Sequence, residues 1–269
     1  MAMRLGIIAG GGDLPRQVIE HCLTESIPFH VLQLAGQATD ACLATYPHTV
    51  VRLGSGRQIY NALRQNNITD VVMIGSVRRP TLFSLWPDWF VIKLLPRLGL
   101  AALGDDGLLR NVIKIIEGYG FSVRGVHEFL PQLLAPDGVL TTTAPDAATQ
   151  HDIALGIEEA LVHGSADIGQ AVVVRGGRII AKEDRTGTDA MLLRVKQGQG
   201  SGGVMVKLCK PQQDQRIDLP TIGVRTVKNA AAAGLRGIAV SAGRTLINNR
   251  ASTVAEADRH GMFIIGVDA

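Results

Sequence analysis

Aromatic side chains are scarce in this sequence. They make up only 4% of the 269 residues, whereas hydrophobic residues make up 46%. A core must therefore be filled mainly by Val, Ile, Leu and Ala, which suits buried parallel strands. An excess of one charge is also lacking: the formal net charge of +3 is too small to indicate nucleic acid as a partner. Charged residues make up 19%, a composition typical of a globular protein rather than a disordered one.

Cysteine is scarce as well. The three cysteines, Cys22, Cys42 and Cys209, are scattered and form no CxxC pair, so neither a zinc site nor a disulfide framework is indicated. A reducing compartment is the simplest interpretation, and we expect a cytoplasmic protein.

Long hydrophobic runs are missing. The apolar run at the N-terminus breaks at glycine and is too short for a signal peptide, and no segment offers ~20 unbroken apolar residues to span a membrane. The stretch Trp86–Leu103 comes closest, but it contains Asp88, Lys93, Pro96 and Arg97. We expect it to be helical and to pack in the core, with contact to lipid as the alternative.

Strand and helix signals alternate in the first half of the chain. Short apolar runs predict strands, and segments with apolar residues at helical spacing predict helices between them. The predicted strands are Leu5–Ala9, Phe29–Leu34, His48–Leu53, Asp70–Gly75 and Phe121–Gly125, and helices are expected at Pro15–Thr24, around Ile59 and Leu63, at Trp86–Leu100 and at Asp105–Tyr119. This alternation predicts an α/β fold with a Rossmann-like parallel sheet over residues 1–130.

The pattern changes near Leu130. Residues 131–138 show no clear period and predict a linker, and a second, catalytic α/β domain is expected over residues 139–269. Its predicted helices are Ala147–His163, Met191–Val195, Thr226–Ala233 and Ser252–His260, and its predicted strands are Val204–Leu208, Gly237–Ser241 and Phe263–Val267. A further pair of runs, Ala171–Val174 and Arg178–Lys182, flanks two glycines and predicts a hairpin.

A glycine-rich turn follows the first predicted strand. Gly10, Gly11 and Gly12 precede Asp13 and the first helix, where backbone N–H groups can approach a phosphate. The turn is not the dinucleotide fingerprint, because Pro15 stands in place of the third glycine, and NAD binding is thus disfavoured. Ligand contact and a plain tight turn are both consistent with the residues.

Two further loops of the first half carry candidate ligand residues. Ser76 and the arginines Arg78 and Arg79 leave the fourth strand at its carboxyl end, where ligands of open α/β sheets bind, although a solvated basic loop is the alternative. Asp105 and Asp106 open a helix, where they are suited to capping and to the helix dipole. The same two carboxylates also suit Mg²⁺.

Carboxylates in the second half are the strongest candidates for chemistry. Thr188 and Asp189 open a helix, and either cap it or contact a substrate or metal. Asp218 lies among apolar residues, where a carboxylate needs a partner such as Arg216 or acts as a base or metal ligand. Lys210 lies just upstream and is suited to offset phosphate charge. Histidine pairs with metal-binding spacing are absent from the sequence.

Five stretches, taken together, resemble one family over nearly the whole chain. They are IIAGGGDLP at the start, GDDGLLR at 104–110, DIGQAVVV at 167–174, GTDAMLLR at 187–194 and DLPTIGV at 218–224. In this order they are similar to the UDP-2,3-diacylglucosamine pyrophosphatases of lipid A biosynthesis that many Gram-negative bacteria carry instead of the metallophosphoesterase type. The segment after Met191 and the GQGSGG loop at 198–203 depart from the usual pattern.

The resemblance implies two α/β domains with substrate between them. It implies hydrolysis of UDP-2,3-diacylglucosamine to UMP and 2,3-diacylglucosamine 1-phosphate (lipid X), with Mg²⁺ and with attack of water on the α phosphorus. The essential aspartate of the family falls on Asp218, and we expect Asp218, with Asp189, to hold Mg²⁺ or to orient the water. We further expect Gly10–Gly12 and Ser76 to cradle phosphate or sugar, and Gln170 and Thr188 to hold polar groups of the substrate.

A lipid substrate also implies a membrane surface. We expect peripheral contact with the cytoplasmic face of the inner membrane, and a homodimer is possible on this interpretation. Two alternatives stay open: another nucleotide-sugar hydrolase or transferase on the same fold, and a regulatory module that binds a UDP-lipid without catalysis.

Overall fold

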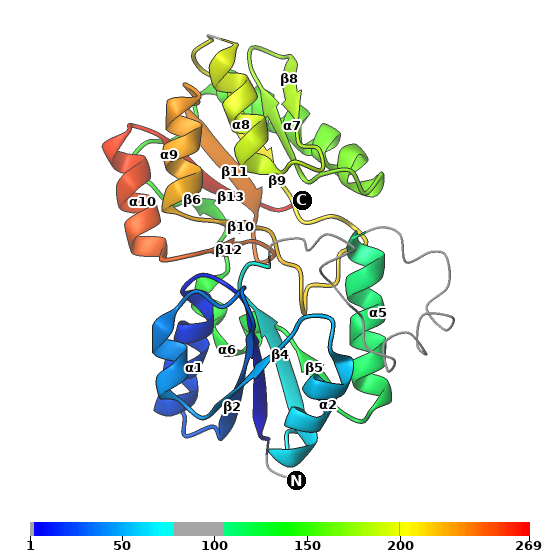
Figure 1. Ribbon diagram of the computed structural model, residues 1–269. Coiled ribbons are helices and arrows are strands. Elements are labelled where there is room, and N and C mark those ends of the chain that lie inside the picture. Colours follow the sequence, from blue (N-terminus) through cyan, green and yellow to red (C-terminus); the bar gives the residue numbers. More distant parts are fainter. Residues whose placement is uncertain (1–2, 78–104, 199) are drawn as a thin grey trace. The chain divides into compact units, whose positions relative to one another are not determined.

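The computed structural model describes residues 3–77, 105–198 and 200–269, and the chain forms two compact units (Figure 1). The first unit comprises Met1–Pro131 and the second Gln132–Ala269. The predicted helix at Trp86–Leu100 and the candidate apolar wall at Trp86–Leu103 lie outside the described residues, as do Arg78 and Arg79.

The first unit contains a five-stranded sheet in the order β3-β2-β1-β4-β5, and every strand pair is parallel. Its strands are β1 (Leu5–Ala9), β2 (Phe29–Leu34), β3 (His48–Val51), β4 (Asp70–Ile74) and β5 (Ser122–Arg124). Its helices are α1 (Leu14–Thr24), the 3-10 helix η1 (Ala41–Thr45), α2 (Gly56–Gln65), α5 (Asp105–Gly118) and α6 (Val126–Phe129). The predicted parallel, Rossmann-like sheet is thereby confirmed.

The order of the strands reverses between β1 and β4. The chain moves from β1 outward through β2 to β3, and then returns to β4 on the other side of β1. Such a reversal is the topological switch point at which open α/β sheets usually bind ligands. The turn at Gly10–Gly12 follows β1, and Ser76 follows β4, so both candidate loops lie at this point of the sheet.

The second unit contains a six-stranded mixed sheet in the order β6-β13-β11-β9-β7-β8. Its strands are β6 (Gly138–Val139), β7 (Ala171–Val174), β8 (Ile179–Lys182), β9 (Val204–Lys207), β11 (Gly237–Ser241) and β13 (Phe263–Val267). The central strands β9, β11 and β13 are parallel, whereas β7 is antiparallel to both β8 and β9. The second α/β domain and the β7–β8 hairpin are therefore confirmed.

Four helices cover the two faces of this sheet (Figure 1). They are α7 (Ala147–Ser165), α8 (Thr188–Gln197), α9 (Val224–Ala232) and α10 (Arg250–Arg259). Alternate residues of a strand point to opposite faces. In β7, Val172 and Val174 pack with α7, while Ala171 and Val173 pack in the cluster that contains α8, α9 and α10. Because helices cover both faces of the sheet, almost every residue of its central strands is buried, and these strands are apolar over nearly their whole length.

Of the segment expected as a linker, residues 131–138, Pro131 belongs to the first unit and the other residues belong to the second. The segment begins with the 3-10 helix η3 (Pro131–Leu133), and its last residue starts β6, which pairs antiparallel with β13. Ala135 is 1% exposed, and its N–H donates to the carbonyl of Thr245 at 2.8 Å. A small two-stranded sheet of β10 (Thr221–Ile222) and β12 (Leu246–Ile247) lies in the same unit.

Of the helices within residues 3–77, 105–198 and 200–269, none combines the length and the apolar character that crossing a bilayer requires.

Candidate functional site

One edge of the second sheet collects polar side chains from three strands. Strands β8 and β9 end there, and β7, which runs antiparallel to both, begins there. The register pairs Ala171 with Lys207, while Gln170 immediately precedes β7 and Glu183 immediately follows β8. The Glu183 N–H donates to the carbonyl of Ala171 at 2.8 Å, which fixes the two strand ends together. Ligands of α/β sheets bind at such carboxyl ends.

Lys207 is buried at this edge and was not predicted as a site residue. It is the last residue of β9, and its side chain is 6% exposed. Nζ donates to Thr188 Oγ1 at 2.8 Å and lies 3.9 Å from Glu183 Oε2. Thr188 Oγ1 in turn donates to Glu183 Oε1 at 2.7 Å. The three side chains form a closed polar triangle that includes the first residue of α8.

The electrostatic environment links Lys207 to the predicted carboxylates. Burial lowers the pKa of Lys207, because the charged ammonium loses its hydration. The carboxylates of Glu183, Asp218 and Asp189 oppose this fall by attraction, whereas the positive charge of Lys210 adds to it. Asp218 and Asp189, which we predicted from the sequence, thus share an electrostatic environment with a lysine that we did not predict.

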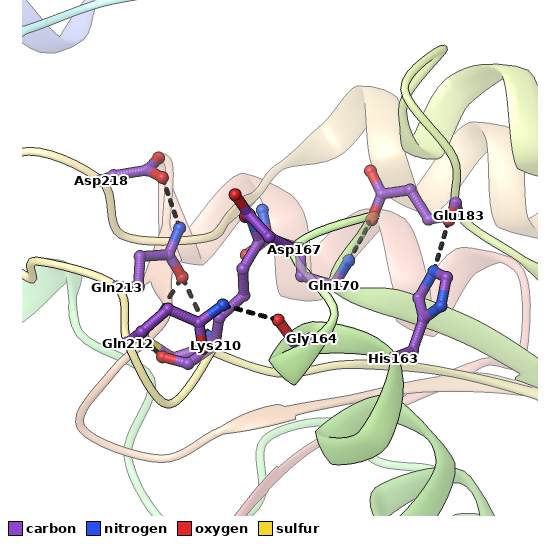
Figure 2. A network of polar contacts seen from close by, with 10 residues as sticks. His163, Gly164, Asp167, Gln170, Glu183, Lys210, Gln212, Gln213 and Asp218 are labelled. Atoms are coloured by element: carbon purple, nitrogen blue, oxygen red, sulfur yellow. Dashed lines mark hydrogen bonds and ion pairs between the residues drawn. The ribbon is translucent and has the colours of Figure 1, made fainter. Parts of the chain in front are cut away.

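Glu183 is held rigidly in place by its neighbours. Its carbonyl accepts a hydrogen bond from His163 Nε2, and its Oε2 accepts from the Gln170 N–H at 3.2 Å (Figure 2). A side chain at Gly169 would place its Cβ 2.4 Å from the Glu183 carbonyl oxygen, so this close approach requires glycine. The Gln170 side chain adds a buried oxygen, Oε1, that has no hydrogen-bond partner within the described residues.

Asp218 is half-buried and is held by a glutamine that was also not predicted. Gln213 Nε2 donates to Asp218 Oδ2 at 2.6 Å, and Gln213 Oε1 accepts from the backbone N–H of Lys210 at 3.1 Å (Figure 2). The sequence suggested Arg216 as the partner of Asp218. The structure instead pairs Arg216 NH2 with Asp214 Oδ2 at 2.8 Å, because the short turn between the two residues brings them together.

Lys210 and Asp189 have protein partners at the same edge. Lys210 Nζ lies 2.6 Å from Asp167 Oδ1. Asp189 Oδ1 accepts from Asn229 Nδ2 at 2.8 Å, and its Oδ2 lies 3.2 Å from Arg225 NH2. Both oxygens of Asp189 therefore face donors, an arrangement that competes with a cation.

The oxygen atoms at this edge could hold Mg²⁺ only with one or two protein carboxylates. No group of three His, Cys, Asp or Glu side chains suited to a metal exists among the described residues. Mg²⁺ keeps several waters, however, and is commonly bound by one or two carboxylates together with substrate phosphates. Asp218 meets this requirement, because within the described part of the chain only its Oδ2 has a hydrogen-bond partner.

A polar hollow of about 250 Å³ adjoins the first turns of α8 and α9. Its lining includes the threonines Thr186, Thr188, Thr221 and Thr226, together with Asp189 and Arg225. Thr188 is thus shared between the hollow and the buried triangle with Lys207 and Glu183.

The glycine turn of the first unit makes internal hydrogen bonds. Gly10 N donates to the Ile74 carbonyl at 2.8 Å, Gly11 N to the Ser76 carbonyl at 2.7 Å, and Gly12 N to Thr39 Oγ1 at 3.1 Å. The Ser76 N–H returns a bond to the Gly11 carbonyl at 2.8 Å. These amides already have acceptors, so a phosphate would have to displace existing bonds. Ligand contact at this turn stays a prediction.

Two further predicted residues open helices of the first unit. Asp13 occupies the N-cap position of α1, and its side chain makes no capping hydrogen bond there. Asp105 is the first residue of α5, and its side chain lies outside the described part. Their predicted contacts with substrate stay predictions.

Sequence reasoning missed Lys207, Glu183 and Gln213. One signal for Lys207 was present: it stands two residues after Met205 in an apolar strand, so strand periodicity places it on a buried face. Glu183 and Gln213 lie in irregular segments, where no period predicts burial.

Matches to known proteins cover nearly the whole chain. The model of the LpxI N-terminal domain matches residues 4–133, and that of the LpxI C-terminal domain matches residues 136–265. A protein of Caulobacter vibrioides named UDP-2,3-diacylglucosamine pyrophosphatase LpxI is 41% identical over 274 residues, which cover 98% of each chain. The structure of Thermus thermophilus UDP-glucose 4-epimerase with NAD is 15% identical, covers 99% of this chain and 86% of that one, and has a TM-score of 0.32.

Proposed function

Because the chain belongs to the LpxI family, we propose that it hydrolyses the pyrophosphate of UDP-2,3-diacylglucosamine to UMP and 2,3-diacylglucosamine 1-phosphate, a step of lipid A biosynthesis. The observation that carries this proposal is the 41% identity to a UDP-2,3-diacylglucosamine pyrophosphatase across 98% of both chains. The polar edge of the second sheet supports it, because a buried lysine, a half-buried aspartate and a threonine-lined hollow gather there.

Asp218 is the proposed catalytic residue. Its Oδ2 is fixed by Gln213, and its Oδ1 remains available to accept a hydrogen bond from the attacking water. A positioned carboxylate that takes a proton from water accelerates attack on phosphorus. The proposed attack is on the α phosphorus, so that the oxygen of water enters UMP.

Mg²⁺ is the proposed cofactor, with Asp218 as its protein ligand. When bound there, Mg²⁺ would supply positive charge that stabilises the negative charge developing on the diphosphate in the transition state. Asp189, whose oxygens face Asn229 and Arg225, is a weaker candidate for a ligand. Lys210 and Arg225 lie at the same edge and contribute further positive charge toward the phosphates.

The test is UMP release from UDP-2,3-diacylglucosamine, with Mg²⁺ and with EDTA. We expect release that EDTA abolishes and that Asp218→Ala reduces at least 100-fold, a loss of about 2.7 kcal/mol in transition-state stabilisation. Asp258→Asn is the matched control, because the carboxylate of Asp258 bonds Thr142 instead of the site residues. Turnover by Asp218→Ala close to that of the wild type would show that Asp218 is not the catalytic residue.

Two further measurements distinguish the site of attack and the alternative functions. In water labelled with ¹⁸O, attack on the α phosphorus puts the label into UMP, and attack on the other phosphorus puts it into the lipid product. Comparable turnover of UDP-sugars without acyl chains would indicate another nucleotide-sugar hydrolase. Tight binding of UDP-2,3-diacylglucosamine without UMP release would indicate a binding module.

Contact with the cytoplasmic face of the inner membrane is part of the proposal, since the two acyl chains of the substrate reside in a bilayer. Flotation of the protein with anionic liposomes that contain UDP-2,3-diacylglucosamine tests this contact. Recovery of the protein only in the lipid-free fraction would contradict it.

A further inference from the structure

The hydroxyl of Thr188 has a fixed direction. A carboxylate only accepts hydrogen bonds, and a lysine amine keeps N–H donors in either protonation state. The hydroxyl proton must therefore point to Glu183 Oε1 at 2.7 Å, while the oxygen accepts from Lys207 Nζ at 2.8 Å. One lone pair of the hydroxyl oxygen remains, so toward a ligand Thr188 is an acceptor.

The residue whose backbone bonds the other oxygen of this carboxylate carries a second acceptor. Glu183 Oε2 receives the Gln170 N–H at 3.2 Å, and Gln170 Oε1 is buried with no partner in the described ranges. A buried polar atom without a hydrogen-bond partner is unfavourable. Of these two acceptors, Thr188 lines the hollow, where a ligand can reach it, whereas Gln170 Oε1 is enclosed by the protein.

Acceptors of this kind do not suit a phosphate. The non-bridging oxygens of an ionised diphosphate are themselves acceptors, and two acceptors without a proton between them repel. A sugar hydroxyl or an amide N–H supplies the missing proton. UDP-2,3-diacylglucosamine has such donors on both sides of its diphosphate: on the glucosamine with its amide-linked acyl chain, and on the uridine.

We propose that Lys207 and Glu183 are positioning residues that hold Thr188 as a hydrogen-bond acceptor for a hydroxyl or amide N–H donor of the substrate, and not for its phosphates. This inference rests on the proposed function. Lys207 and Glu183 act through Thr188, since both are buried, Lys207 donates to its hydroxyl oxygen and Glu183 accepts its hydroxyl proton.

The first test measures product binding by calorimetry. Thr188→Val keeps the shape but removes the hydroxyl, and Thr188→Ser keeps the hydroxyl. We expect Thr188→Val to weaken either 2,3-diacylglucosamine 1-phosphate or UMP roughly tenfold, which is about 1.4 kcal/mol, while Thr188→Ser stays within about threefold of wild type. Which product weakens identifies the half of the substrate that carries the donor.

The second test asks whether Lys207 acts through Thr188. Lys207→Met alone should weaken the same product as Thr188→Val does, and the double variant should lose little beyond either single variant. Binding of the other product and the thermal midpoint serve as controls for folding. If Lys207→Met does not fold, Glu183→Gln replaces it in the same cycle, because it keeps the size of the buried side chain.

Three results would overturn the inference. They are unchanged binding of both products by Thr188→Val, a tenfold loss of inorganic pyrophosphate binding in that variant, and additive losses in the double variant. Failure of the proposed function is distinct, since it appears as absent UMP release by the wild-type protein.

Discussion

Gln213 offers a sharp test of how Asp218 is held. It is 7% exposed, its Nε2 lies 2.6 Å from Asp218 Oδ2, and its Oε1 accepts from the N–H of Lys210. Gln213→Leu removes the donor without adding charge. The carboxylate then loses the protein contact that fixes it against the loop after β9, and the angle of Asp218 toward water is no longer defined.

The expected loss follows from the kind of bond removed. A hydrogen bond to a charged group contributes about 1.5–3 kcal/mol. If that contribution is needed in the transition state, kcat for UMP release falls roughly 10- to 150-fold. The KM for UDP-2,3-diacylglucosamine should change by less than about threefold, because Gln213 itself is not proposed to touch the substrate.

The neighbouring glutamine provides the matched control. Gln212 Nε2 donates to the Gly164 carbonyl at 2.8 Å instead of to Asp218 (Figure 2). Gln212→Leu makes the same chemical change one residue away, so kcat should stay within about twofold of wild type. A thermal melt of both variants separates a loss of catalysis from a loss of folding.

Gln213→Glu gives an independent readout. It places a second carboxylate beside Asp218, and two carboxylates this close share a proton. The shared proton is released as the pH rises, so the activity of this variant should rise with pH more steeply than that of the wild type. The reasoning is refuted if Gln213→Leu is folded and keeps wild-type kcat, or if Gln212→Leu loses as much.

Three further predictions concern packing and titration. Gly156→Ala should lower the free energy of unfolding, measured by urea titration, by about 1–2 kcal/mol. The added Cβ would lie 2.4 Å from Val206 Cγ2, and this overpacking outweighs the gain in helix propensity. Equal stability of the variant and the wild type would contradict this. Burial raises the pKa of Cys22 to about 11, so a thiol reagent at pH 8 should label exposed Cys42 first and Cys22 only after unfolding, as peptide masses would show. Burial is the main cause that holds the pKa of His30 below its ordinary 6.5, so the stabilisation by His30 is present above that pH and is lost as the pH falls. The thermal midpoint of the wild type should therefore fall between pH 7 and pH 5, and this difference should be smaller in His30→Gln. An unchanged difference would contradict this.

The fold was largely readable from the sequence because its strands are buried on both faces. Runs such as Leu5–Ala9 and Ala171–Val174 are apolar throughout, and helical periods separate them, so their type and order follow from hydrophobicity alone. The two-residue strands β6, β10 and β12 were not predicted. A strand that short has no period, and only its long-range partners define it.

The candidate site was readable only in part. Asp218 and Thr188 stand in recognisable stretches at the ends of elements, and the structure puts both at the polar edge of the second unit. Their partners are brought to the site by contacts across the sheet or by irregular turns, and no local sequence pattern predicts such contacts. These partners are Gln213, Glu183 and Lys207. Sequence therefore predicts the reactive group better than the groups that orient it.

The paired amides of Gly11 and Ser76 have a consequence for dynamics. Each donates to the carbonyl of the other residue, at 2.7 and 2.8 Å. The loop after β1 and the loop after β4 are therefore paired by backbone hydrogen bonds, as neighbouring strands are. Loops normally exchange their amide hydrogens with solvent quickly, whereas paired amides exchange only when the pairing opens. Slow deuterium uptake at both residues would therefore report that the loops stay closed, and a ligand that used these amides would reveal itself by changing that rate.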